Sequence, residues 1–148
     1  MAGRPRKTKS RTVAQAAPPS QAALALARLP FGTDLTEWPR QWMGFPKDVP
    51  PGEQIVDCFR PFLNHLIQRQ LSRPTLRKHV NNLWVLGGEI IRKLNDTPAL
   101  RNVPIPDLVF DVVEDDGPLP YGCDSEEEGR SFESTCRKLR RFLEQQAR

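Results

Sequence analysis

Apolar residues recur every three or four positions over three stretches of this chain, which is the spacing of an amphipathic α-helix. The stretches run from about residue 52 to 70, from 72 to 95 and from 131 to 146. Ser72 fits the N-cap of the second stretch, and Pro74 falls in its first turn, where a missing N–H does no harm. The pattern predicts an all-α fold whose core is made by residues 53–97 and 129–146.

Two features interrupt the predicted helices. Pro61 lies inside the first helix and removes the hydrogen bond to the carbonyl of Asp57, so we expect it to kink the helix or divide it. Gly87 and Gly88 lie in the apolar stripe of the second helix, where each costs roughly 1 kcal/mol relative to Ala. Either this helix bends at the glycines, or another backbone packs against them. The stripe otherwise consists of Leu76, Val80, Leu83, Trp84, Ile90, Ile91 and Leu94.

The segments between these helices are rich in proline and charge. Residues 31–52 are Pro-rich, and we expect an irregular wrap that is anchored by Trp38 and Trp42, one helical turn apart. The spacing of the valines after Pro106 fits either a short helix or a strand. The acidic residues over 111–128 predict a solvated surface loop.

The N-terminal part of the chain has a different composition. Residues 1–19 are basic and then rich in Ala, Gln and Pro, and we expect a disordered tail because they bury too little apolar surface to offset the ordering entropy. Ser20 fits the cap of a short helix through Leu29. The predicted organisation is a basic tail and linker over 1–30, followed by a single helical domain over 31–148.

The net charge of +4 hides separate blocks of charge. Residues 1–12 and 129–148 are basic, and the acidic stretch lies between them. Such blocks are typical of polyanion contact at the ends, although ordinary solubility also accounts for them. No apolar run approaches the roughly 18 residues of a membrane span. Three widely spaced cysteines argue against disulfides and structural zinc and favour reduced thiols in a cytoplasmic protein: Cys58, Cys123 and Cys136.

The start of the second predicted helix carries a motif, Leu71-Ser72-Arg73-Pro74-Thr75-Leu76-Arg77-Lys78-His79 and on to Leu83. This run resembles the start of the second helix in the core-binding domain of tyrosine recombinases, the phage-integrase-like proteins. The stretch from Ser131 to Leu143 resembles the closing helix of that domain, where a Ser and a Thr precede basic residues and a Leu-x-x-Phe face. The resemblance covers roughly 53–97 and 129–146 and implies a small orthogonal four-helix bundle.

In that family the bundle clamps one side of a DNA duplex, and basic and polar residues near the helix starts meet phosphates. The resemblance therefore implies double-stranded DNA as the partner. A helix N-terminus offers N–H groups and a positive dipole end to a phosphate, and Lys and Arg neutralise phosphates with little regard to sequence. Carried over by position, the implied contacts are Arg73, Thr75, Arg77, Lys78 and Asn81.

The tail carries a second DNA-related pattern. Gly3-Arg4-Pro5-Arg6-Lys7 resembles the core of an AT-hook, an extended segment that enters the narrow A·T minor groove. Under this interpretation Arg4, Arg6 and Lys7 form an auxiliary DNA-binding arm. A plain basic tail and a transit peptide are alternatives, because nothing acidic occurs before Asp34.

No arrangement of a nucleophile and a base at meaningful spacing is present. His65 and His79 fall on different predicted helices, and His79 fits the packed edge of an apolar stripe. No phosphate-loop or dinucleotide motif occurs, and we expect no enzyme activity, no cofactor and no metal. The only tyrosine, Tyr121, precedes the final helix, so the recombinase strand-cleavage chemistry is not expected.

Two other hypotheses remain open. The chain could be a protein–protein interaction module that binds through Trp38, Trp42 and Phe45 or through the acidic residues over 111–128. It could also be the remnant of a truncated integrase. A contiguous exposed aromatic patch favours the interaction module, whereas buried tryptophans together with a clustered basic face favour DNA.

Overall fold

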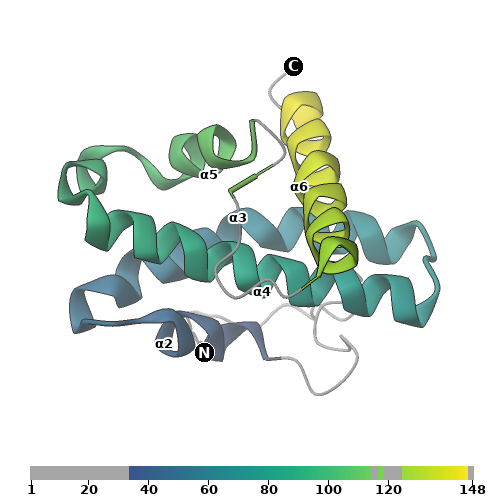
Figure 1. Cartoon of the computed structure of the whole chain (residues 1–148), viewed down its shortest axis with the longest axis horizontal. Coiled ribbons are helices and arrows are strands. Elements are labelled where there is room, and N and C mark those ends of the chain that lie inside the picture. The colour runs from purple at the N-terminus through teal and green to yellow at the C-terminus, as the bar shows by residue number, and fades with distance from the viewer. Residues whose placement is uncertain (1–33, 115–116, 119–124, 147–148) are drawn as a thin grey trace, which may run out of the picture.

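The computed structural model of this chain describes residues 34–114, 117–118 and 125–146, and these form an all-α bundle without a strand (Figure 1). The predicted all-α class is thus confirmed. Three short 3₁₀ turns join the helices: η3 (Leu35–Glu37), η4 (Pro46–Asp48) and η5 (Pro98–Asn102). The five α-helices in this part of the chain are α2 (Trp38–Trp42), α3 (Val49–Gln68), α4 (Arg73–Asp96), α5 (Ile105–Val113) and α6 (Glu126–Gln146).

The long helices α3 and α4 form a hairpin that supports the rest of the bundle. Figure 1 shows α4 running across the molecule and α6 crossing it steeply, with α5 and α2 on opposite sides of the hairpin. Helix α3 packs against α2, α4 and α5, and α6 packs against α4 and α5. Every long helix therefore buries one face, which is how an amphipathic helix gains most of its stability.

One continuous core lies between these helices. The stripes predicted for α3 and α6 are confirmed, since Phe59, Leu63 and Leu139 have no exposed surface. Burying a side chain of this size contributes roughly 1.5–3 kcal/mol. The largest fully buried side chains are Phe59, Phe62, Ile55, Leu63, Leu66, Leu83, Leu86, Ile90, Ile91, Leu94, Leu139 and Val109.

Local chemistry sets where the two helices of greatest interest begin. Ser72 caps α4 as predicted, because its Oγ accepts the Thr75 N–H at 3.3 Å. Ser125 does the same for α6, accepting the Glu128 N–H at 3.1 Å. The glutamates that follow Ser125 lie in the first turn of α6, where their charge complements the helix dipole.

The structure corrects several predicted boundaries. Residues 126–128 were expected in the acidic loop but belong to α6, and residues 111–113 belong to α5, which also excludes the strand alternative. The Pro-rich wrap over 31–52 contains helical turns and the start of α3 at Val49. Pro61 does not divide α3, which continues to Gln68. In the Pro-rich segment, α2 and α3 each have a proline in the first turn, where proline is preset for a helix start.

The glycine pair in α4 has a different role from those expected. A Cβ at Gly87 would overlap the indole of Trp42, so the close neighbour is a side chain and not a second backbone. A Cβ at Gly88 would meet Trp42 Cδ1 at 3.4 Å, an ordinary contact. Trp84, assigned to the buried stripe, is instead 42% exposed, because α2 covers Gly87 beside it and leaves the Trp84 ring at the surface.

Several predictions lie outside the described residues. These are the disordered tail over 1–19, the helix from Ser20 to Leu29, and the central part of the acidic stretch with Tyr121 and Cys123. The proposed arm falls there as well: Arg4, Arg6 and Lys7. Among the helices that are described, none is both long and apolar enough to cross a membrane.

Candidate nucleic-acid interface

All five residues implied in DNA contact are exposed on the first three turns of α4. Arg73, Arg77 and Asn81 are four positions apart and follow one side of the helix. Lys78 diverges from Arg77 by about 100° around the helix axis, and Thr75 lies further round. The structure therefore brings three of the residues onto one stripe and places two on the neighbouring side.

The N–H groups at the start of α4 are largely occupied within the protein. Thr75 donates its N–H to Ser72 Oγ, and Ser72 Oγ donates to Thr75 Oγ1 at 2.8 Å. The Leu76 N–H binds the carbonyl of Ser72 at 2.9 Å, and Pro74 has no N–H. The cap thus takes up the donors that were expected to face a phosphate, and the charged side chains are left to carry such a contact.

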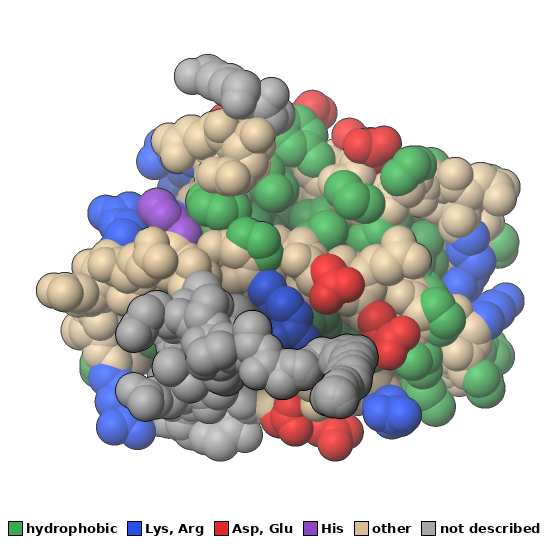
Figure 2. All heavy atoms as spheres, turned by 180° about the vertical axis from the view of Figure 1, so that it is seen from behind, with side chains coloured by type: hydrophobic (Ala, Val, Ile, Leu, Met, Phe, Trp, Pro, Cys, Tyr) green, Lys and Arg blue, Asp and Glu red, His purple; other side chains and the backbone are tan. Residues whose placement is uncertain are grey.

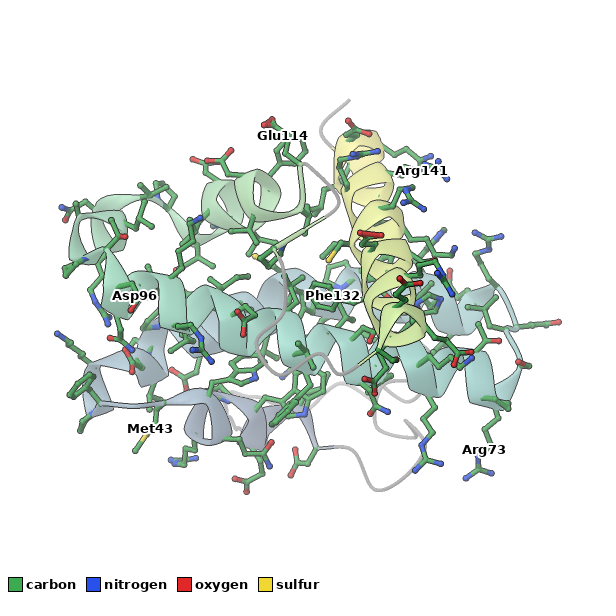
Figure 3. The ribbon with its side chains drawn as sticks, viewed as in Figure 1. Met43, Arg73, Asp96, Glu114, Phe132 and Arg141 are labelled. Carbon is green, nitrogen blue, oxygen red and sulfur yellow. The ribbon has the colours of Figure 1, made fainter. Side chains whose placement is uncertain are left out.

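Further basic side chains from α3 and α6 lie at the same end of the bundle. Arg69 is the exposed C-cap of α3, three residues before Ser72. Lys138 of α6 lies close enough to α4 that its charge helps lower the pKa of His79. Figure 3 shows Arg73 at the lower edge of the view, at the start of α4, and Arg141 at the upper edge, towards the C-terminal end of α6. We call these residues the basic end: Arg69, Arg73, Arg77, Lys78, Lys138 and Arg141.

The sequence on either side of the turn between α3 and α4 contains no carboxylate. Residues 61–88, which include the whole turn between α3 and α4, contain four Arg or Lys residues and no Asp or Glu. Figure 2, seen from behind, shows Lys and Arg side chains at both ends and in the middle of that face, with acidic side chains between them. The missing acids are a sequence signal that could have added Arg69 to the candidate site.

A buried polar seam fixes α6 on α4 beside the basic end. His79 Nδ1 lies 2.8 Å from Thr135 Oγ1, and both side chains are buried. Asn82 Nδ2 donates to Thr135 Oγ1 at 2.8 Å and to the Ser131 carbonyl and Oγ at 3.1 Å. Burial, followed by the charge of Lys138, lowers the pKa of His79 below 6.5. His79 is thus a packed, neutral histidine in the folded protein, as its place at the edge of the stripe predicted.

A second polar cluster lies at the opposite end of α4 and was not predicted. Asp48 is fully buried and accepts hydrogen bonds from Arg101 Nη2 at 2.7 Å and from Asn95 Nδ2 at 3.2 Å. The backbone N–H groups of Gly44 and Phe45 donate to Asp48 Oδ2 at 2.9 Å. Burial by itself would raise the pKa of Asp48, but these four donors outweigh it and lower the pKa from 3.8 to about 2. Asp48 is therefore a charged structural anchor.

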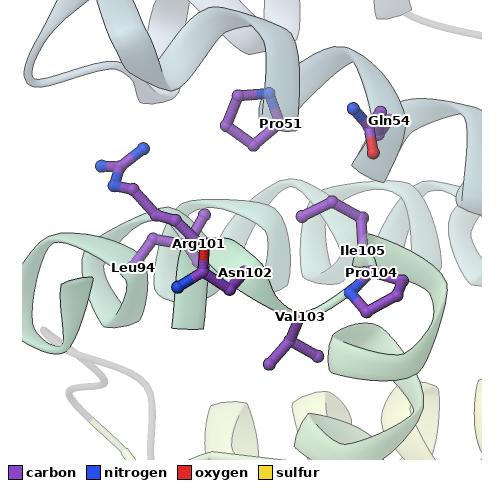
Figure 4. A pocket seen from close by; sticks show the side chains of 8 residues that line it. All are labelled: Pro51, Gln54, Leu94, Arg101, Asn102, Val103, Pro104 and Ile105. Atoms are coloured by element: carbon purple, nitrogen blue, oxygen red, sulfur yellow. The ribbon is translucent and has the colours of Figure 1, made fainter. Parts of the chain in front are cut away.

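A cleft of about 310 Å³ lies beside this anchor, between the start of α3 and the segment after α4 (Figure 4). Arg101 is the one charged residue among those that line it. Its Nη2 is committed to Asp48 and Asn95, at 2.7 and 2.6 Å, and we assign no ligand to the cleft. No group of three or more His, Cys, Asp or Glu that could hold a metal occurs in the described ranges.

The aromatic residues divide into buried and exposed members. Trp38 is 5% exposed and stacks obliquely on Trp42, with ring centroids 5.6 Å apart, so the expected anchoring by these two rings is confirmed. Phe45 and Met43, by contrast, are 54% and 42% exposed between α2 and η4. A buried tryptophan, which was expected of a DNA-binding module, and an exposed phenylalanine, which was expected of a protein-interaction module, therefore occur in the same structure.

The geometry thus consists of one end of the bundle that carries positive charge from α4, α6 and the C-cap of α3, and a separate set of exposed apolar side chains. Neither is arranged around a reactive group among the residues described. Comparison of the chain with protein-family models, curated proteins and solved structures found no match.

Proposed function

We propose that this chain is a non-catalytic helical module that binds double-stranded DNA through the basic end. The observation that carries the proposal is the gathering of exposed Arg and Lys residues from α3, α4 and α6 around a turn whose flanking sequence has no acids. Phosphate contacts of this kind need positive charge on a fixed scaffold and little else. The cap on α4 and the seam to α6 supply such a scaffold.

The motif at the start of α4 supports the same function. Residues 71–83 resemble the recombinase core-binding domain, in which a small orthogonal bundle clamps one side of a duplex. Under this proposal α3, α4, α5 and α6 are the four helices of that bundle, and α2 is an addition. The chain then belongs with recombination or mobile-element systems, and Arg4, Arg6 and Lys7 reach the adjacent minor groove.

The test is a salt-titrated duplex-binding assay on the full chain. We expect micromolar or weaker affinity that falls steeply with salt, since non-specific binding depends on counterion release. Arg73→Ala, Arg77→Ala and Lys78→Ala together should remove most of the affinity. They should also reduce the slope of log K against log salt by about three.

The matched control variant removes the same number of positive charges outside the basic end. Arg40, Arg92 and Lys93 are exposed bases outside the basic end, and their combined change to Ala should alter affinity only slightly. Circular dichroism should show both triple variants folded, because all six side chains lie at the surface. Equal losses in the two triple variants would mean that net charge, and not this surface, governs binding, and the proposal would then be abandoned.

A second candidate function, protein binding, is favoured by the exposure of Met43 and Phe45. Lys47 Nζ lies 5.5 Å from the centre of the Phe45 ring, which gives this patch one basic edge. Binding through such a patch is driven by apolar burial and is nearly independent of salt. A partner whose affinity is lost on Phe45→Ser but retained in the Arg73, Arg77 and Lys78 triple variant would establish this second function.

A further inference from the structure

A groove of about 310 Å³ lies between α2 and α4, on the side of α4 that carries Asn81. Its lining includes Trp38 and Val80, which are buried at 5% and 2% exposure and form an apolar floor. Two exposed carboxylates, Asp34 and Glu37, lie on the α2 side. The groove therefore joins an apolar surface to a negatively charged one.

Trp84 forms the other side of the groove and is held in a defined orientation. Its Nε1 donates to Gln41 Oε1 at 2.9 Å, and its carbonyl accepts from Trp42 Nε1 at 2.8 Å. The ring is nevertheless 42% exposed. A fixed indole face beside carboxylates attracts a side chain with a cationic head and an apolar stem, through cation–π and ion-pair contacts.

We propose that residues 20–31 of this same chain occupy the groove. The first reason is continuity: Asp34 lines the groove, so the chain that precedes it starts at the groove's edge. The second is composition, because Leu24, Leu26 and Leu29 supply apolar side chains for the floor and for Trp84. A segment this close along the chain also has a high effective concentration, so modest contacts are enough to hold it.

Charge complementarity selects the same segment. Arg28 is the only Arg or Lys between residues 12 and 39, and no acid precedes Asp34. Arg28 lies six positions before Asp34, a span of at most about 20 Å, and Asp34, Glu37 and Trp84 all line the same groove. The docked segment covers the exposed indole and pairs Arg28 with the acidic side of the groove. This proposal is argued without the nucleic-acid binding, and the two proposed surfaces share Asn81.

Hydrogen exchange followed by mass spectrometry on the full chain tests the docking. After correction for intrinsic rates, we expect amides of residues 22–31 to exchange at least about tenfold more slowly than those of residues 2–12. Trp84→Ala should remove this protection, because the indole forms one side of the groove. Phe45→Ala is the control, since Phe45 is at least as exposed but does not line the groove.

A charge exchange tests the pairing without touching the core. Arg28→Glu and Glu37→Arg should each lower the protection of residues 22–31, and the double variant should regain part of it. Glu37 is chosen because Asp34 caps the turn at Thr36 with its own side chain. A double variant no better protected than either single variant would overturn the assigned pairing.

Two results would overturn the docking itself. One is exchange of residues 22–31 as fast as that of residues 2–12, and the other is protection that persists in folded Trp84→Ala. Protection that rises with protein concentration, together with a doubled mass in sedimentation, would assign the groove to a second copy of the chain. That result would also refute the intramolecular contact.

Discussion

Two adjacent glycines in α4 differ in what surrounds them. At Gly87 the Trp42 indole occupies the space of a side chain, whereas at Gly88 a methyl group would fit at van der Waals distance. The local cost of glycine in a helix is the same at both positions. The two positions differ only in how α2 packs against them. Tertiary structure therefore requires glycine at position 87 and does not require it at position 88.

This difference gives opposite effects for the same substitution. Gly87→Ala should destabilise the protein by about 1–3 kcal/mol, because Trp42 must move to admit the methyl group. Gly88→Ala should be stabilising by up to about 1 kcal/mol, because it raises helix propensity without overlap. Urea unfolding at neutral pH measures both variants. Similar destabilisation by both would contradict the assigned packing of Trp42.

At the scale of elements, the seam between α4 and α6 is polar where most of the core is apolar. His79, Asn82 and Thr135 share hydrogen bonds that set the register of the two helices. Because α6 carries Lys138 and Arg141, this register also sets how its charges lie relative to those of α4. A change in the seam is therefore expected to affect both stability and the basic end.

The seam makes stability depend on pH. Burial and Lys138 keep the pKa of His79 below its ordinary value of 6.5, so the unfolded chain binds the proton more readily than the folded one. The contribution of neutral His79 is fully present above pH 6.5 and should decrease as the pH falls below it. Thermal unfolding between pH 8 and 5 measures this slope.

His79→Gln should flatten that slope, because the amide does not titrate. His65→Gln serves as the comparison, since it removes the only other histidine of the chain while leaving the seam intact. A slope that persists unchanged in His79→Gln would show that another group is responsible.

At the scale of the whole molecule, Asp48 joins segments that are far apart in the sequence. Its carboxylate links the stretch between α2 and α3 to Asn95 at the end of α4 and to Arg101 in η5. Arg101 Nε is buried without a hydrogen-bond partner in the described part of the chain. The Asp48 carboxylate is therefore the group that compensates the positive charge of Arg101. The Asp48 carboxylate therefore fixes the end of the bundle opposite the basic end.

Removing the charge of Asp48 should be costly. Asp48→Asn leaves Arg101 without its ion pair, and we expect a loss of about 3–5 kcal/mol at neutral pH. Because the pKa of Asp48 falls from 3.8 to about 2 on folding, the wild-type protein should lose about 2 kcal/mol as the pH drops from about 4 to 2. Unfolding in urea at a series of pH values measures both effects.

The control for this prediction is Asp57→Asn. Asp57 pairs with Arg60 at 3.6 Å with 74% of its side chain exposed, so its removal should cost less than about 1 kcal/mol. An Asp48→Asn variant as stable as Asp57→Asn would show that the buried ion pair has no net structural value.

The sequence alone was sufficient for the helices of the hairpin and for α6, because their buried faces follow a local period that needs no knowledge of partners. The Ser72 cap and the pairing of Trp38 with Trp42 were predictable for the same reason, since they depend on residues within one turn. Tertiary structure decided what depends on residues distant in the sequence. These features are the exposure of Trp84, the contact of Gly87 with Trp42, the Asp48 cluster, and the approach of Lys138 to His79 of α4. Such contacts are determined by how helices cross, and periodicity within one helix carries no information about that crossing.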